Sequence, residues 1–231
     1  DLKEERSQSL SASMNWDKPT EKHIYGFTLE GFYTRLKDAF ILEEIGTDDS
    51  GNSLLEKRNG GLSNVYGATF EARTNYNRMF QLEGGITLQK SLYNAPVAWS
   101  EQIPGTTEYL RTPEAYGYYT FTVTPGNRFS ASLSGIYTGS MLVPHYGLAG
   151  DAGTPEQDVL FSTPDFLEMN LKLGYIFNVN RLDSSIELFS GVSNMLNHYQ
   201  NDFDTGKNRD SAYIYGPAKP RTFFLGLRIF N

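Results

Sequence analysis

The chain has 231 residues, no cysteine and a net charge of −7 from 27 acidic and 20 basic residues. The lack of cysteine excludes disulfides and thiolate chemistry, and the acidic balance argues against nucleic acid, which needs a basic partner. No apolar run approaches the roughly 20 residues of a membrane helix, although strands that are apolar only at alternate positions remain possible. The 15 tyrosines and 15 phenylalanines suit a membrane interface or the strands of a soluble all-β domain.

The first ten residues, DLKEERSQSL, lack the basic start, apolar core and cleavage site of a signal peptide. An exported chain of this kind is expected to be a mature form or a fragment. From there apolar side chains recur at every second position, which is the period of a half-buried strand. About nine such strands are predicted, in chain order at residues 10–16, 25–34, 66–77, 80–89, 119–124, 129–138, 167–178, 185–188 and 222–229.

Many of these strands reach the roughly 9–11 residues that a tilted strand needs to cross a bilayer. Alternation places one apolar face toward lipid, with Phe80, Leu82, Ile86, Leu133, Leu171, Leu173, Leu225 and Leu227 on it. The pair Gly84-Gly85 inside one strand predicts a bend or bulge.

The predicted connections alternate in length. Short ones fall near residues 17–23, 77–79, 124–127 and 178–183, and long ones near 44–53, 92–114, 139–164 and 193–220. Short turns on one side and long loops on the other are typical of outer-membrane barrels. Such barrels have an even number of strands, so an odd count of nine predicts that further strands precede Asp1.

Three stretches resemble the C-terminal barrel of TonB-dependent outer-membrane receptors. Their form is most similar to that of receptors from the Bacteroidetes group. DLKEERS at residues 1–7 resembles the segment that leads into a mid-barrel strand of that family, and GVSNMLNHY at 191–199 resembles the close of the penultimate strand. PRTFFLGLR at 220–228 resembles the final strand, although Asn231 stands where the family usually ends on an aromatic residue.

The resemblance implies that residues 1–231 form the C-terminal part of a larger, roughly 22-stranded barrel in the bacterial outer membrane. It also implies partners: outer-membrane lipid, the remaining strands, a plug domain and a TonB-binding segment upstream, the TonB complex, and in some cases a surface lipoprotein. The implied activity is active import of a scarce nutrient, such as an iron complex or siderophore, haem, cobalamin or a glycan. The form of the chain's end favours an iron chelate or cobalamin over a glycan.

Two groups of candidate site residues follow. Charged side chains on the inward face are expected to contact the plug, or to be solvated in the lumen: Glu71, Arg73, Glu83 and Lys172. Aromatic side chains in the long loops are expected to contact a planar or hydrophobic ligand, or simply to pack the loops: Tyr93, Trp99, Tyr109, Tyr146, Tyr199, Tyr213 and Tyr215.

No catalytic constellation, cofactor motif or metal site is predicted, and the chain is not expected to be an enzyme. His23, His145 and His198 are expected to be solvated. The segment 202–210 places oxygen side chains at alternate positions but lacks the glycine and glutamate of a calcium loop, so a plain solvated loop is expected.

Two other hypotheses stay open. One is a complete small outer-membrane barrel that acts as a porin or a lipid-modifying enzyme. The other is a soluble β-sandwich that binds carbohydrate. The apolar face decides between a sandwich, which buries it, and a barrel, which exposes it to lipid.

Overall fold

The computed structural model describes residues 2–47, 53–100, 102–147, 155–179, 184–207 and 209–230. Within those ranges no helix is both long and apolar enough to cross a membrane. The strands, in chain order, are β1 (Arg6–Pro19), β2 (His23–Lys37), β3 (Phe40–Thr47), β4 (Ser53–Asn59), β5 (Ser63–Tyr76), β6 (Phe80–Val97), β7 (Thr106–Glu108), β8 (Ala115–Val123), β9 (Phe129–Thr138), β10 (Leu142–His145), β11 (Val159–Ser162), β12 (Phe166–Val179), β13 (Ser184–Ser193) and β14 (Thr222–Phe230).

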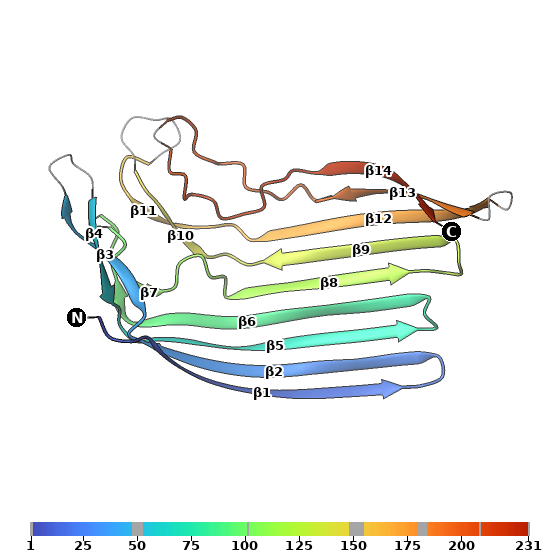
Figure 1. Ribbon diagram of the computed structural model, residues 1–231, viewed down its shortest axis with the longest axis horizontal. Coiled ribbons are helices and arrows are strands. Elements are labelled where there is room, and N and C mark those ends of the chain that lie inside the picture. The colour runs from blue at the N-terminus through green and yellow to red at the C-terminus, as the bar shows by residue number, and fades with distance from the viewer. Residues whose placement is uncertain are drawn as a thin grey trace.

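The long strands lie side by side in one antiparallel sheet (Figure 1). Its order is β1-β2-β5-β6-β8-β9-β12-β13-β14, with β7 paired beside β6, and β1 and β14 form its two edges. Each of the nine predicted segments overlaps a different one of these nine strands, and 66–77 and 119–124 run one residue past the strand end. The all-β antiparallel prediction is confirmed.

The pairing register collects the apolar positions of all these strands on one face. One row runs from Leu82 through Phe121 and Leu133 to Leu171, because directly opposed residues point to the same side. Another row joins Leu173 through Ser190 to Leu225. The side chains expected to face lipid therefore do share one face.

This apolar face is open. Leu225 is 74% exposed and Ile86 is 45% exposed. The buried apolar side chains of the described residues lie instead at the long-loop end: Ile103, Val143, Phe166 and Tyr213. A β-sandwich would bury its apolar face between two sheets, so the exposure argues against a sandwich.

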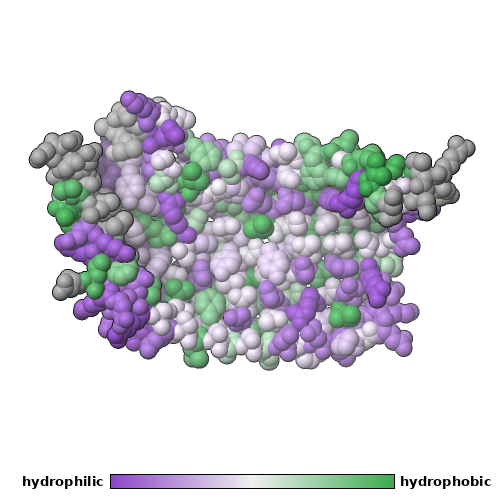
Figure 2. Space-filling model, viewed as in Figure 1, coloured by the Kyte–Doolittle hydropathy of each residue, from purple (hydrophilic) through white to green (hydrophobic). Residues whose placement is uncertain are grey.

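The opposite face carries the alternate, polar positions. Glu71 lies opposite Thr28, and Glu83 lies opposite Arg73 and Thr120. In Figure 2 the middle of the viewed surface is hydrophilic to neutral, as expected for a face of threonine, serine, glycine and charged side chains.

Short turns gather at one end of the sheet and long connections at the other (Figure 1). The turn from β5 to β6 is the tightest example: Asn77 and Arg78 have φ of 54° and 58°, and the Met79 N–H donates to the Tyr76 carbonyl at 2.9 Å. Two successive positive φ values are those of a type I′ turn, whose twist matches that of the strands it joins.

The long connections contain more structure than the alternation predicted. β3 and β4 form a separate hairpin between β2 and β5, and β10 and β11 form another between β9 and β12. In the predicted loop at 92–114, β6 continues to Val97 and pairs with β7. The long connections therefore contain two separate two-stranded sheets and one short strand of the main sheet.

The bulge that was one of the two alternatives predicted at Gly84-Gly85 is wrong. The register of β6 with β5 and with β8 runs unbroken through both glycines. A Cβ atom on Gly84 would lie 2.9 Å from the Tyr118 carbonyl oxygen, and one on Gly85 would lie 3.1 Å from the Tyr118 ring. Gly85 makes room for the Tyr118 ring, and Gly84 makes room for the neighbouring backbone of β8.

Candidate functional site

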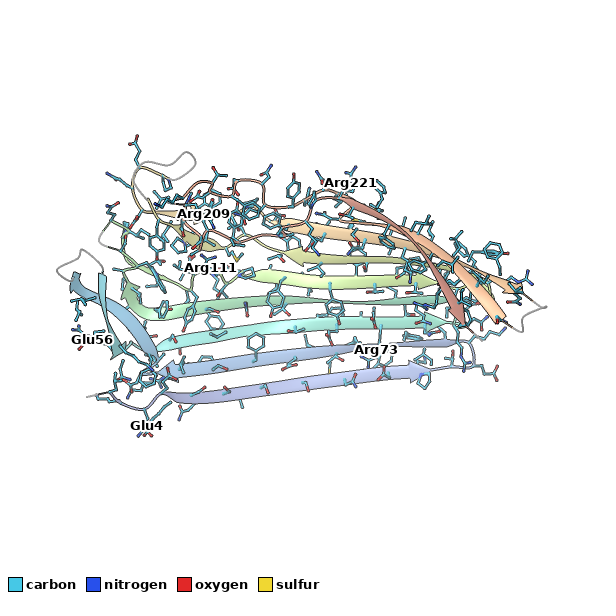
Figure 3. All side chains as sticks on the ribbon, turned by 45° about the horizontal axis from the view of Figure 1, so that its top comes forward. Glu4, Glu56, Arg73, Arg111, Arg209 and Arg221 are labelled. Carbon is cyan, nitrogen blue, oxygen red and sulfur yellow. The ribbon has the colours of Figure 1, made fainter. Side chains whose placement is uncertain are left out.

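The charged residues predicted to face the lumen all lie on the polar face. Glu71, Arg73 and Glu83 sit on β5 and β6, and Lys172 sits on β12 opposite Ser132. Arg73 lies over the strands, far from Arg111 and Arg209 at the long-loop end (Figure 3).

Arg73 is held in place by side chains of the edge strand β1. Its guanidinium donates to both carboxylate oxygens of Asp17, at 3.0 and 2.7 Å, and to Asn15 at 2.7 Å. On the other side of β5, Glu71 accepts a hydrogen bond from the Tyr118 hydroxyl at 3.0 Å. These side chains form a fixed polar surface, and their contact with a plug stays a prediction.

One group of loop aromatics forms where β6 and β7 pair. The Tyr93 and Tyr109 rings stack with centroids 4.2 Å apart, and Trp99 lies 6.5 Å from Tyr93. The Tyr109 hydroxyl bonds to the Ser63 hydroxyl at 2.6 Å. The indole N–H of Trp99 is buried and finds no hydrogen-bond partner within the described part of the chain. This group packs the base of the loop.

A second group forms between the β10–β11 hairpin and the segment that leads to β14. Tyr213 is buried at 3% exposure, and its ring stacks on His145 with centroids 3.6 Å apart. Tyr215 contacts Tyr213 and Phe161 edge-on or tilted. Together these rings form a compact aromatic core above the end of the sheet.

Both tyrosine hydroxyls of this second group converge on one carboxylate. Tyr215 donates to Asp202 at 2.8 Å, and Tyr213 donates to it at 3.1 Å. Burial and the hydrogen bond to Asp202 raise the pKa of Tyr213 to about 12, and the same causes raise the pKa of Tyr215 further. Both side chains are therefore neutral hydrogen-bond donors at physiological pH.

The remaining predicted aromatics, Tyr146 and Tyr199, are half-buried. The Tyr146 backbone N–H donates to Asp210 at 3.1 Å. Burial is the main cause that raises the pKa of the Tyr146 hydroxyl, and the nearby negative charges of Asp158 and Asp210 raise it further. The structure thus brings five of the predicted aromatics into two packed groups, and ligand contact stays a prediction for each.

The expectation that His145 is solvated is wrong. His145 is buried, and its Nε2 lies 3.0 Å from each carboxylate oxygen of buried Asp204. These residues are far apart in the sequence, so no local pattern could have indicated the pair. His198 is exposed as expected, whereas His23 is half-buried and shares a 2.6 Å hydrogen bond with Thr74.

The segment 202–210 is likewise not a plain solvated loop. Asp204 accepts from the Asp210 backbone N–H at 3.0 Å, and Asp210 accepts from the Ala212 N–H at 2.8 Å. Arg111, from the connection between β7 and β8, donates to the backbone carbonyl oxygens of Ala212 and Ile214. The carboxylates of the segment organise the loop, and no cluster of metal-ligating side chains is found among the described residues.

A cavity of about 370 Å³ opens at the long-loop end, where β6, β8, β9 and β10 come together. We call it the rim cavity. Uncharged hydrogen-bonding side chains line much of it: Gln89, Ser91, Thr112 and Ser140. Its acidic lining residues are Glu108 and Glu114. The alternation of apolar and polar residues could not predict this cavity, because the cavity forms where the chain leaves the regular strands.

Comparison with known families gives a match over residues 1–195 to the family described as "TonB dependent receptor-like, beta-barrel". Among solved structures, the ferric-catecholate import receptor Fiu of E. coli K12 is 22% identical, with a TM-score of 0.67 over 99% of this chain and 28% of its own. The copper transporter OprC is 12% identical, with a TM-score of 0.63 over 100% of this chain and 32% of its own.

The outer membrane transporter YddB of E. coli is 12% identical, with a TM-score of 0.60 over 100% of this chain and 33% of its own. At these identities the structural likeness shows the fold. The chain spans about a third or less of the length of each of these proteins. Comparison with curated proteins finds no match.

Proposed function

Because the chain belongs to the β-barrel family of TonB-dependent receptors, we propose that it is the C-terminal barrel portion of an outer-membrane transporter that imports a scarce nutrient with TonB-supplied energy. The family resides in the outer membrane, and its members are receptors and transporters. The observation that carries the proposal is the two-faced sheet: one face is apolar across nine strands, the other is polar, and the long connections gather at one end.

The two faces have separate tasks in this proposal. The apolar face meets lipid, since it is exposed and alternates strictly with polar positions. The polar face lines a lumen that holds a plug domain, with Glu71, Arg73, Glu83 and Lys172 offering fixed charge. The long-loop end faces outward and takes part in ligand capture, together with the rest of the receptor and, in some systems of this kind, a surface lipoprotein.

We propose an iron chelate, haem or cobalamin as the ligand class. Fiu is described as a ferric-catecholate import receptor and OprC as a copper transporter, and both share this fold. The half-buried rings of Tyr93, Tyr146 and Tyr199 offer partly accessible aromatic surface, which suits recognition of a large, partly apolar chelate.

Whole-cell uptake tests the proposal. Cells that express the complete gene would be given radiolabelled ferric chelates, haem and cyanocobalamin, in a host with TonB and in the same host without it. We expect saturable uptake of one class that disappears without TonB. Uptake that is linear in concentration and independent of TonB would instead indicate a porin, and would overturn the proposal.

A further inference from the structure

The short turns carry a charge opposite to that of the chain as a whole. Residues 18–22, 77–79 and 124–128 lie at the turns from β1 to β2, from β5 to β6 and from β8 to β9, all at one end of the sheet (Figure 1). We call these residues the turn patch. Its charged members are four cations and one carboxylate, in a chain whose net charge is −7: Lys18, Lys22, Arg78, Arg128 and Glu21.

We propose that the turn patch binds the phosphate groups of anionic phospholipids in the periplasmic leaflet of the outer membrane. The short turns of outer-membrane barrels face the periplasm, so the patch lies near the headgroups of that leaflet when the apolar face is in lipid. The inference rests on the proposed function for this orientation, and it adds a binding surface to that function.

The four cations are available to a partner. Their side chains are exposed and make no hydrogen bond or ion pair within the described part of the chain. Nearby Asp17 does not compete for them, because it is paired with Arg73 at 2.7 Å. Glu71 and Glu83 lie on the polar face, which points away from lipid. Glu21 is therefore the one carboxylate of the patch that weakens its attraction for an anion.

The backbone of the patch is fixed by hydrogen bonds between neighbouring turns. The Asn77 N–H donates to the Lys22 carbonyl at 2.7 Å, and the Thr124 hydroxyl donates to the Arg78 carbonyl at 2.9 Å. The Arg128 carbonyl accepts a backbone N–H of β12 at 2.8 Å. These bonds hold the cationic residues in a row across successive turns, so binding orders side chains alone and not the loop.

Exposed aromatic side chains on the apolar face lie beside the patch: Trp16, Tyr76, Phe80, Phe129 and Tyr175. Lys18 follows Trp16 by two positions in β1, so both side chains point to the lipid side. Aromatic belts mark the headgroup level of a membrane, and a lysine just beyond the belt reaches the phosphates. This continuity with the lipid-facing surface favours a lipid headgroup over a soluble acidic partner.

The test uses the complete receptor, purified in detergent, and native mass spectrometry of its complexes with phosphatidylglycerol and with phosphatidylethanolamine of the same acyl chains. The patch variant combines Lys18→Gln, Lys22→Gln, Arg78→Gln and Arg128→Gln. The matched control removes four exposed cations at the long-loop end: Arg35→Gln, Lys37→Gln, Lys219→Gln and Arg221→Gln. Glu21→Gln, a third variant, removes the carboxylate. Heat-modifiable gel migration shows that each variant is folded, and TonB-dependent uptake is measured in parallel.

A lysine or arginine near an anionic membrane surface strengthens binding about fivefold. We expect wild type to prefer phosphatidylglycerol at least about fivefold, the patch variant to lose this preference, and Glu21→Gln to increase it. The preference should shrink at about 1 M salt, where the Debye length is about 3 Å. The matched control should keep the wild-type preference.

Four results overturn the patch: no preference in wild type, an unchanged preference in the patch variant, an equal loss in the matched control, or displacement of the lipid by a soluble polyglutamate peptide. The last of these would identify an acidic peptide as the partner. A lipid preference that depends on the patch, without TonB-dependent uptake, overturns the transport function and leaves the patch standing. Uptake without the preference does the reverse.

Discussion

His145 and Asp204 join the β10–β11 hairpin to the segment before β14 through a buried pair. Removing the imidazole leaves the buried Asp204 carboxylate without one of its hydrogen-bond partners, at a cost of about 1–3 kcal/mol. We therefore expect His145→Ala to open the segment 198–221 locally, seen as faster hydrogen exchange and proteolysis there, while the strands stay protected. His198→Ala, at an exposed position, is the control, and equal protection in both variants would contradict the assigned role.

The raised pKa of Tyr213 makes the stability of its loop depend on pH. Burial and the bond to Asp202 raise its pKa to about 12 from an ordinary value of about 10. The folded loop holds this proton more tightly than the unfolded loop, so the stabilisation is complete below about pH 10 and is lost as the pH rises toward 12. The tyrosinate absorbance difference between wild type and Tyr213→Phe should show that late titration, and Asp202→Asn should shift it to lower pH.

At the scale of the strand, the two faces predict unequal costs for the same charge. Leu171 lies mid-strand on the apolar face of β12, and Ser134 lies on the polar face of β9 opposite Asn170. Leu171→Arg should destabilise the folded barrel by about 2–4 kcal/mol, whereas Ser134→Arg should cost far less. Refolding into detergent micelles, followed by heat-modifiable gel migration, measures both.

Asn170 is a poorer control than Ser134, although it adjoins Leu171 in sequence. Its side-chain oxygen accepts the Asn194 backbone N–H at 2.9 Å, so an arginine there would also lose a hydrogen bond that holds the end of β13. Similar losses of folded barrel in Leu171→Arg and Ser134→Arg would show that the faces are wrongly assigned.

The strands were readable from the sequence because a period of two that persists over ten or more residues rarely arises outside a strand with one apolar face. The face of Leu82, Leu133 and Leu171 followed from the same period and is confirmed by the register. The β3–β4 and β10–β11 hairpins were missed, since short strands in long loops show too few alternations to stand out. The bulge at Gly84-Gly85 was predicted wrongly because a glycine that makes room for a neighbouring ring or backbone looks, in sequence, like one that forms a bulge.

The loop site was less predictable, for a physical reason. Aromatic composition indicated Tyr213 and Tyr215, but their partner Asp202 was read as part of a solvated loop. The contacts of Arg111 with residues 212 and 214 and of His145 with Asp204 join segments that are distant in the chain. Such contacts depend on how the strand order places loop bases side by side, which single-sequence patterns do not encode.

For the molecule as a whole, the two sheet edges decide whether the sheet can close into a barrel by itself. β1 and β14 are the first and ninth strands along an antiparallel path, so they run in the same direction, as Figure 1 also shows. Closing the sheet on itself would require a parallel pair, whereas bacterial barrels of this kind are antiparallel with an even strand number. Left unpaired in a bilayer, each edge backbone group costs several kcal/mol.

We therefore predict that in the complete receptor β1 and β14 each pair with strands outside residues 1–231. Residues 1–231 contain no cysteine, and any cysteine elsewhere in the receptor is first replaced by serine, so that only the engineered pairs can form a disulfide. Ser9→Cys with Thr34→Cys, whose native hydroxyls lie 3.0 Å apart across β1 and β2, should form a disulfide under mild oxidation. Ser13→Cys combined in turn with Phe224→Cys, Gly226→Cys or Arg228→Cys, on the same polar face of β14, should not. A disulfide between β1 and β14 would mean that the sheet closes on itself, and the larger-barrel assignment would then be wrong.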